Sequence, residues 1–417
     1  MKRSSHSFLA LVCLAAGLSV AVSAPTSKAA ASDKRDTGPS TRPDPHKYVS
    51  YDYAEAAKKI KVRLTVPEGL AVVRGILVVA AFSGGDTRNF YREVWYREFL
   101  HLHGFAFLGA ECSNSHAEQS KVMHNALRQI AVDSKHPELV NAPYVATGFS
   151  SGGGFASRLL VEVPDKVIAA VIVGSQPRLT DIMLTDTHRG TPLCIINGEH
   201  EDNGMAKAVE PVLAEHRPKG AVWGWMAVPG ISHERDGQEV LAMPMLDAAV
   251  RLRYPADGDV RKGPVKLKPV DSTSGWVADN STWKSGLTAV VLAKDFKGGI
   301  AKSSWLLNED LAFIYRAYAT YSRPLTITTP RSAKDLVWDA GTGVSIVVDD
   351  SRFAGWKKLE LFDGAKKVGE LTGGPAEFIV TDLKAGYHAF SVLGTDGKGN
   401  IRPSDPVLVV VRKLPQP

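Results

Sequence analysis

Residues 148–152 read Gly-Phe-Ser-Ser-Gly, between a short apolar run at 143–147 and a helix-type run at 153–160. A glycine-flanked serine between a strand and a helix is the G-x-S-x-G pattern of a nucleophile elbow. The serine of such an elbow lies on a tight and strained turn, so its neighbours must be small. The sequence therefore predicts a reactive Ser150 at the junction of a strand and a helix.

Further apolar runs alternate with helix-type segments around this motif. The expected strands are Ile60–Val66, Ile76–Phe82, Phe105–Ala110, Val167–Val173, Pro192–Asn197 and Ala221–Val228, and the expected helices include Gln119–Ser134, Met205–His216 and Gln238–Leu252. Such alternation indicates βαβ units and a parallel sheet that is buried on both faces. The predicted fold class for residues 47–254 is therefore α/β, with a doubly wound and mostly parallel sheet.

The N-terminal residues have the pattern of a targeting segment. Lys2 and Arg3 precede an apolar run, Phe8–Val22, and small residues follow it. This pattern predicts a cleaved signal peptide at 1–24 and a secreted or periplasmic protein. The run is too short for a membrane anchor, so we expect no membrane span after cleavage. Residues 25–46, rich in Ser, Thr, Pro and charge, are expected to form a disordered leader.

The overall composition excludes some classes of function. The chain has 417 residues and a formal charge of +6, which is spread along its length without a dense Lys/Arg stripe. We therefore expect no nucleic-acid partner. Cys112 and Cys194 could pair in an exported protein, but both adjoin apolar runs, which favours buried free thiols. His101-x-His103 is interpreted as the end of a helix, and neither a metal nor a cofactor is expected.

The composition changes after Arg253. Residues 255–322 contain scattered tryptophans and one helix-type segment, Asn308–Thr320. Their Trp and Leu content favours an extension packed on the preceding domain over a free linker.

The chain from residue 323 to 417 has an all-β pattern. Strand candidates are Leu325–Thr329, Val344–Asp349, Lys358–Phe362, Lys367–Leu371, Glu377–Val380, His388–Leu393 and Val407–Val411. Asp363-Gly364 is typical of a hairpin turn. Short strands at this density predict a small β-sandwich. The run from Leu383 to Asn400 resembles the last hairpin of bacterial immunoglobulin-like or fibronectin-type modules, which implies a spacer or a binding module.

Residues 47–254 resemble the α/β-hydrolase superfamily, and in particular its secreted esterases and polyhydroxyalkanoate-depolymerase-like members. The resemblance implies a catalytic order of serine, acid and histidine along the chain. Ser150 opens this order. His233 follows the last predicted strand of the sheet, in Pro-Gly-Ile-Ser-His, and is the candidate base. A surface-loop histidine is the alternative interpretation.

The acid is expected directly after the strand that ends at Asn197. The family pattern there is G-x-x-D, and counting from Gly198 gives Glu201, with Asp202 next to it. We favour Glu201 over Asp202, and Glu199 is a weaker third candidate. A solvated acidic turn is the alternative interpretation of these carboxylates.

The same resemblance implies two backbone donors for an oxyanion. One is the N–H of Ser151, the residue after the nucleophile, and the other belongs to the Ser-Gly-Gly loop at 83–85. Gly85 is the preferred second donor and Gly84 the next. Asp86 and Arg88 beside this loop are expected to brace it, rather than to orient a substrate.

Together these residues predict a secreted serine hydrolase that cleaves carboxylic esters through an acyl-enzyme, on acylated polysaccharide or a polyester. A serine peptidase or amidase of the same fold is the alternative, and a non-catalytic carbohydrate-binding or adhesion protein is a weaker one. Trp223, Trp225 and Met226 could form an aromatic substrate platform, but core packing is the preferred interpretation. The sequence does not specify the oligomeric state.

Overall fold

The computed structural model describes residues 45–111, 116–179, 184–201, 204–235, 237–331, 336–341 and 343–412. The predicted signal peptide, the predicted leader up to residue 44, Cys112 and Asp202 lie outside the described residues. No helix among the described residues is long and apolar enough to cross a membrane.

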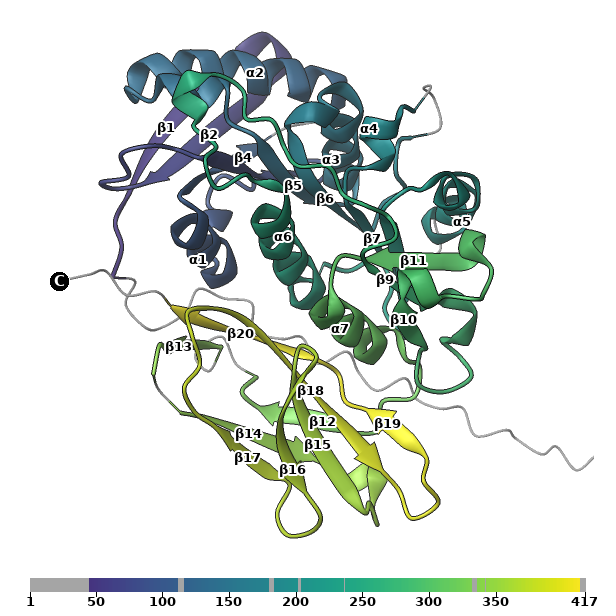
Figure 1. Ribbon diagram of the computed structural model, residues 1–417. Helices are drawn as coiled ribbons and strands as arrows, with labels where there is room; N and C mark the ends of the chain where they lie inside the picture. The colour runs from purple at the N-terminus through teal and green to yellow at the C-terminus, as the bar shows by residue number, and fades with distance from the viewer. Residues whose placement is uncertain are drawn as a thin grey trace, which may run out of the picture. The chain divides into compact units, whose positions relative to one another are not determined.

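The first part of the described chain is built around one sheet (Figure 1). Its strands are β1 (Tyr48–Glu55), β2 (Ile60–Pro67), β3 (Gly75–Ala80), β4 (Phe105–Glu111), β5 (Tyr144–Phe149), β6 (Val167–Val173), β7 (Leu193–Gly198) and β8 (Trp223–Val228). They lie in the order β1-β2-β4-β3-β5-β6-β7-β8. The strands from β4 to β8 in this order run parallel to one another, whereas β2 is antiparallel to both β1 and β4. The predicted doubly wound and mostly parallel sheet is confirmed.

Helices cover both faces of this sheet. They are α1 (Val94–His103), α2 (His116–Asp133), α3 (Ser151–Glu162), α4 (Asp186–Arg189), α5 (Met205–His216) and α6 (Glu239–Arg253). One apolar core joins α2 and α3 to the sheet through Met123, Leu127 and Phe155, and a second joins α1 and α6 to it through Phe99 and Leu246. In Figure 1 these two pairs of helices lie on opposite sides of the strands.

The two edge strands of the sheet are β1 and β8. β1 is an additional antiparallel strand whose side chains are all at least partly exposed, so its sequence lacks an apolar run. At the other edge, Trp223 and Met226 of β8 are 0% exposed and Trp225 is 6% exposed. Trp223 and Met226 therefore pack inside the domain, which is the core packing that the sequence predicts, and Trp225 keeps a small exposed fraction.

Residues 255–322 form a small sheet and a helix. The sheet has the order β10-β9-β11, with β9 at Trp276–Asp279, β10 at Val290–Leu292 and β11 at Ser303–Leu306, and it is followed by α7 (Glu309–Ala319). Asn308 caps α7 by accepting a hydrogen bond of 2.9 Å from the Leu311 N–H. Ser304 Oγ accepts from the Trp225 N–H at 2.9 Å and donates to the Trp225 carbonyl at 2.7 Å. This segment therefore satisfies backbone groups on the open edge of β8.

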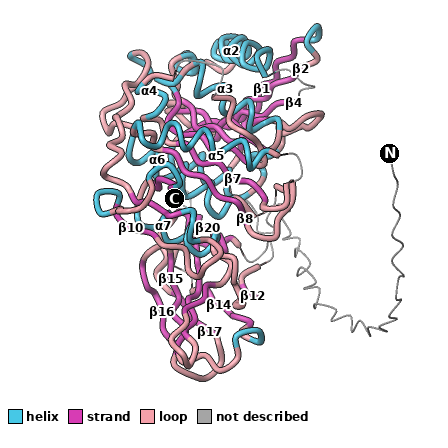
Figure 2. Tube along the Cα trace, turned by 90° about the vertical axis from the view of Figure 1, so that its right-hand side faces the viewer, coloured by secondary structure: helices cyan, strands magenta, loops and turns pink. Residues whose placement is uncertain are grey.

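The C-terminal residues form two sheets around one core. The strands are β12 (Thr326–Thr329), β13 (Val337–Asp339), β14 (Val344–Asp349), β15 (Lys358–Asp363), β16 (Lys366–Leu371), β17 (Glu377–Val380), β18 (Gly386–Thr395), β19 (Ile401–Pro403) and β20 (Val407–Arg412). The sheets have the orders β12-β14-β17 and β13-β20-β18-β15-β16, with β19 paired to β18. Ile346 of the first sheet and Leu361, Phe390 and Val409 of the second share the core. Figure 2 shows these strands gathered below the α/β part. The predicted immunoglobulin-like sandwich is confirmed.

Two neighbouring side chains of β18, Tyr387 and His388, form hydrogen bonds to other segments of the chain. Tyr387 Oη donates a hydrogen bond of 2.5 Å to the Trp95 carbonyl of α1. His388 places Nδ1 2.7 Å from Asp363 Oδ2 and Nε2 2.8 Å from the Lys384 carbonyl. Because a carbonyl only accepts, Nε2 must carry a proton, and the carboxylate favours a second proton on Nδ1. Burial opposes the charged ring, but the hydrogen bond to Asp363, the charge of Asp363 and the bond to the Lys384 carbonyl together outweigh burial and raise the pKa of His388.

The stability of the protein should therefore depend on pH through the protonation of His388. A raised folded-state pKa contributes stability below the ordinary histidine pKa, and this contribution is lost as pH rises through the raised value. We expect the difference in unfolding free energy between the wild type and His388→Gln to shrink as pH rises from about 6 to 8.5. Urea titrations of both proteins at several pH values measure it. A difference that stays constant or grows over this range would contradict a charged His388.

Candidate active site

Ser150 occupies a strained turn between β5 and α3. Its φ is 55° and its ψ is −124°, a conformation that non-glycine residues rarely adopt. Its N–H donates to the Val173 carbonyl at 2.8 Å, and its carbonyl accepts from the Gly153 N–H at 2.9 Å. The serine thus ends a sheet ladder and begins a helix in one residue, as the pentapeptide predicts.

The glycines of the motif permit this turn because backbone fills the space beside them. A Cβ on Gly148 would lie 2.4 Å from both the carbonyl carbon and the carbonyl oxygen of Gly152. A Cβ on Gly152 would lie 2.4 Å from the Ala80 carbonyl oxygen. Since backbone cannot move aside as a flexible side chain can, only glycine fits at these two positions.

We expect Gly148→Ala to lower the unfolding free energy by about 3 kcal/mol, because the new methyl group overlaps the first turn of α3. Gly299→Ala is a matched control, since no atom lies within 4 Å of the Cβ that would be added there. Chemical denaturation of both variants gives the comparison. Equal stability of the two variants would show that the elbow can relax around an added methyl group.

The strand order and the strained serine together settle the architecture. The α/β part of this chain has the α/β-hydrolase fold. In this fold the loops at the carboxyl ends of the parallel strands carry the site. Ser150 follows β5, Glu201 follows β7 and His233 follows β8.

The structure brings His233 to Ser150. The His233 Nε2 lies 3.0 Å from Ser150 Oγ, although 83 positions separate the two residues along the chain. The imidazole packs on the Phe149 ring with 4.7 Å between ring centroids. Its side chain is 35% exposed, so a substrate can reach it. This distance allows a proton to pass from the hydroxyl to a neutral imidazole.

Glu201 lies behind the imidazole. Its Oε1 is 3.3 Å from His233 Nδ1, and its side chain is 0% exposed. Its Oε2 accepts a hydrogen bond of 3.0 Å from Asn197 Nδ2. Glu199, the third candidate acid, instead accepts from Tyr321 Oη at 2.6 Å and from the Gly230 N–H at 3.1 Å. Asp202, the second candidate, lies outside the described residues.

The loops that carry Glu201 and His233 are fastened to each other. The His200 N–H donates to the Ile231 carbonyl at 2.9 Å. A Cβ on Gly198 would lie 2.2 Å from the Ser232 carbonyl oxygen, so the two loops approach as closely as glycine allows. This contact limits the freedom of the acid and the base to move relative to each other.

Asn197 is a site residue that the sequence pattern does not identify. It is 0% exposed, and its Oδ1 accepts from Trp225 Nε1 at 3.1 Å while its Nδ2 donates to Glu201. A line of hydrogen bonds therefore runs from Trp225 through Asn197 and Glu201 to His233. The available signal was a polar residue at the end of the apolar run at 192–197, where an asparagine needs buried partners.

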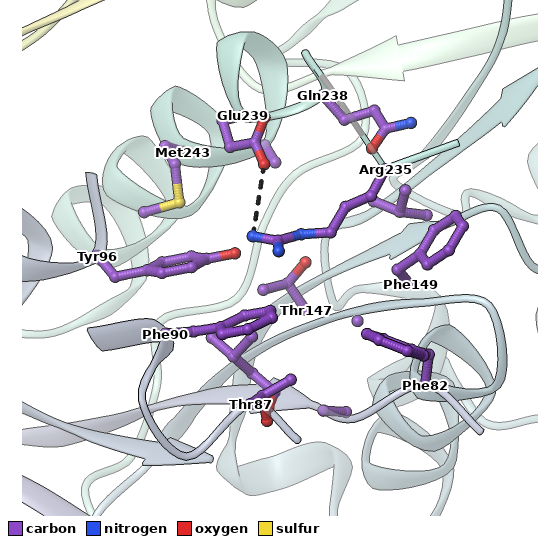
Figure 3. Close-up of a pocket in the computed structure, with 15 residues that line it drawn as sticks. Phe82, Thr87, Phe90, Tyr96, Thr147, Phe149, Arg235, Gln238, Glu239 and Met243 are labelled. Carbon is purple, nitrogen blue, oxygen red and sulfur yellow. Dashed lines mark hydrogen bonds and ion pairs between the residues drawn. The ribbon is translucent and has the colours of Figure 1, made fainter. Parts of the chain in front are cut away.

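Arg235 is a second residue that the sequence pattern does not identify. It lies beside a small cavity of about 30 Å³ that Gly148 and Phe149 also line. Figure 3 shows its guanidinium directed between Glu239, Tyr96 and Phe90. Its Nη2 lies 2.6 Å from Glu93 Oε2 and 3.8 Å from Glu239 Oε1. These contacts tie the loop of His233 to the starts of α1 and α6.

Glu93, the partner of Arg235, is itself a perturbed acid. Burial raises the pKa of Glu93 to about 7, while the guanidinium of Arg235 opposes this change. Trp95 Nε1 also donates to its Oε2 at 3.0 Å. Glu93 is therefore expected to change its charge near neutral pH, close to the loop that holds His233.

The backbone N–H groups proposed to bind the oxyanion belong to two segments, the start of α3 and the loop at 83–85. Ser151 begins α3, where the first N–H groups of a helix have no partner within the helix. Gly84 is exposed with a φ of 71°. The Gly85 N–H already donates to the Phe82 carbonyl at 2.8 Å. Among the described residues the N–H of Phe82 has no hydrogen-bond partner, so it is an additional candidate donor.

Asp86 and Arg88 form a local ion pair beside this loop. Arg88 Nη2 lies 2.7 Å from Asp86 Oδ2 and 2.6 Å from Glu111 Oε2 of β4. The guanidinium of Arg88 holds the pKa of Asp86 below its ordinary value. These contacts attach the loop to β4, which is the bracing role that the sequence analysis favoured.

The cysteine and histidine candidates lie away from this site. Cys194 of β7 is a buried free thiol, and burial raises its pKa to about 12. His103 ends α1 and lies 2.8 Å from Asp247 Oδ1. Within the described ranges, no group of three or more His, Cys, Asp or Glu side chains could hold a metal ion.

Comparison with known proteins finds distant structural likeness. No protein-family model matches the chain, and no curated protein matches it. The fluorophosphonate-binding serine hydrolase FphF of Staphylococcus aureus is 13% identical, with a TM-score of 0.36, and the match covers 50% of this chain and 99% of that one. A dienelactone hydrolase of Anabaena variabilis is 17% identical, with a TM-score of 0.35 and coverage of 49% and 97%.

The C-terminal part also has a structural match. The fibronectin(III)-like modules of Clostridium thermocellum CbhA are 19% identical, with a TM-score of 0.19, and the match covers 21% of this chain. This chain spans 45% of the length of that structure. Such distant likenesses carry no argument about activity, which must come from the geometry of the site.

Proposed function

We propose that this protein is a serine hydrolase that cleaves carboxylic esters through an acyl-enzyme intermediate. The observation that carries the proposal is the continuous line from Ser150 Oγ to His233 at 3.0 Å and from His233 to the buried Glu201 at 3.3 Å. A serine hydroxyl is a weak nucleophile unless a neighbouring base removes its proton, and this line supplies that base.

In the acylation step, Ser150 Oγ attacks the ester carbonyl carbon and its proton passes to His233 Nε2. The carbonyl oxygen becomes an oxyanion, for which the free N–H of Ser151 at the start of α3 is suited. The C–O bond to the alcohol then breaks, and His233 returns the proton to the leaving oxygen. In the second step, His233 Nε2 removes a proton from water, and the water oxygen attacks the acyl carbon. The bond from this carbon to Ser150 Oγ then breaks, His233 returns the proton to Oγ, and the carboxylic acid leaves.

Glu201 orients and stabilises the base in this scheme. Its carboxylate accepts the Nδ1 proton of His233, which leaves the Nε2 lone pair directed at Ser150. It also stabilises the imidazolium that forms during the attack. Burial by its surroundings and the hydrogen bond from Asn197 Nδ2 hold the carboxylate in place.

Export and a polymeric substrate belong to the same proposal. The basic and apolar pattern of residues 1–24 supports export, and the C-terminal sandwich is consistent with attachment to an extended substrate. Acetylated polysaccharide and polyhydroxyalkanoate are therefore the first polymers to assay. Release of acetate or of hydroxyalkanoate would identify the substrate class.

Labelling with a fluorophosphonate probe tests the proposed chemistry directly. We expect stoichiometric labelling of the folded protein, with the adduct located on Ser150 by peptide mass spectrometry. An initial burst of p-nitrophenol from p-nitrophenyl acetate would report the acyl-enzyme. A folded protein that neither labels at Ser150 nor hydrolyses p-nitrophenyl esters would refute the proposal.

A further inference from the structure

A second cavity lies away from Ser150, where the extension meets α5 and β8. Its volume is about 640 Å³, which is within the usual range for small-molecule sites. The residues that line it come from six segments of the chain and include Lys207, Trp225, Trp283, Lys284, Lys302 and Tyr321. The candidate catalytic residues Ser150, Glu201 and His233 are not among them.

The floor of this cavity is aromatic. Trp225 and Trp283 are 6% and 7% exposed, and their ring centroids lie 5.2 Å apart. Tyr321 adds a third ring, and Lys284 Nζ lies 5.0 Å from the centroid of that ring. Aromatic walls of this kind favour a flat and apolar ligand body.

The rim of the cavity has an excess of positive charge. Three lysines, Lys207, Lys284 and Lys302, line it together with two carboxylates, those of Glu199 and Glu210. Glu199 Oε1 lies 3.7 Å from Lys284 Nζ, and the Glu199 carboxylate is already engaged by Tyr321. Within the described part of the chain, neither Lys207 nor Lys302 takes part in an ion pair. Two ammonium groups are therefore available to an anionic ligand.

We propose that this cavity binds an aromatic carboxylate. The ring would lie against Trp225 and Trp283, and the carboxylate would lie between Lys207 and Lys302. An aromatic ring fits better than a sugar, because the aromatic side chains of Trp225, Trp283 and Tyr321 line the cavity and offer flat apolar surfaces.

The site is separate from the nucleophile but connected to the acid behind it. Trp225 both lines the cavity and donates to Asn197, which in turn donates to Glu201. Because Ser150 does not line the cavity, occupancy is expected to be independent of whether Ser150 is free or covalently modified. This independence distinguishes the cavity from a subsite of the active centre.

Calorimetric titration of the full chain with 2-naphthoate tests the proposal, with neutral 2-naphthamide and with galacturonate as comparisons. We expect 2-naphthoate to bind with one-to-one stoichiometry, and to bind equally well after Ser150 has been labelled with a fluorophosphonate. We expect Lys207→Ala combined with Lys302→Ala to weaken binding about tenfold, since two partly exposed ion contacts are lost. Trp283→Leu should weaken it by a similar factor.

Lys219→Ala combined with Lys262→Ala is the matched control, because it removes the same charge from exposed lysines outside the cavity. If this control binds 2-naphthoate as tightly as the wild type, the weaker binding of the Lys207→Ala and Lys302→Ala variant is due to the cavity lysines and not to the change in net charge. Absence of 2-naphthoate binding, equal affinity for 2-naphthamide, or tighter binding of galacturonate would overturn the proposal. Loss of binding after labelling of Ser150 would also overturn it, whether or not the protein proves to be an esterase.

Discussion

Replacing Ser150 by alanine is expected to lower kcat/KM for p-nitrophenyl acetate by about 10⁶-fold, to the level of a protein without a nucleophile. The physical reason is that the Ser150 hydroxyl, which lies 3.0 Å from His233 Nε2, is the group from which attack is proposed to occur. Alanine fits the site sterically, so the strained turn should persist. The loss should therefore appear in kcat and not in stability.

Steady-state kinetics and thermal unfolding of Ser150→Ala and wild type make this measurement. Ser285→Ala removes an exposed hydroxyl elsewhere and is the control for any effect of serine loss in general. Activity of Ser150→Ala within tenfold of the wild type would mean that hydrolysis occurs at another centre. The proposed function would then fail even though the fold stands.

Glu201→Gln is expected to lower kcat by about 10³- to 10⁴-fold with a smaller change in KM. Asn197 Nδ2 donates to one oxygen of the native carboxylate at 3.0 Å, so a glutamine would place its own oxygen there. Its amide NH₂ would then face His233 Nδ1 and donate to it. The imidazole would carry its proton on Nε2, where it cannot accept the proton of Ser150.

The neighbouring acid provides the decisive comparison. We expect Asp202→Asn to retain kcat within about threefold of the wild type, because the carboxylate of Glu201 already lies beside His233 Nδ1. Both variants keep the size of the side chain, so the difference isolates the carboxylate. A large loss in Asp202→Asn together with a small loss in Glu201→Gln would reassign the acid.

Local pattern predicted the elements of this fold well. The predicted strands Val167–Val173 and Val344–Asp349 and the predicted helix Met205–His216 have the observed bounds. A buried strand appears in the sequence as a short apolar run, and an amphipathic helix appears as a repeat of apolar residues. A short window of sequence is therefore sufficient to predict either element. β1 was missed because its alternating side chains are all partly exposed and no apolar run marks it.

The residues of the candidate active site were harder to predict from local sequence pattern than the strands and helices. The glycines and the serine of 148–152 identified the elbow, because only glycine fits where backbone approaches backbone. The loop at 198–202 offered several carboxylates, and the order of residues alone left Glu201 and Asp202 as alternatives. The structure places the carboxylate of Glu201 at the ring of His233. The N–H of Gly85, the preferred second donor, is used inside its own loop.

The sequence by itself determined the alternation of strands and helices, the strained position of Ser150 and the β-sandwich that follows. Each of these depends on residues close together in the chain. Only the tertiary structure brought Asn197 to Trp225, Arg235 to Glu93, and Trp283 to Trp225. Each of these contacts joins separate segments of the chain that are far apart in sequence. No local period encodes them, because their formation depends on how the packed helices and the sheet fold those segments toward one another.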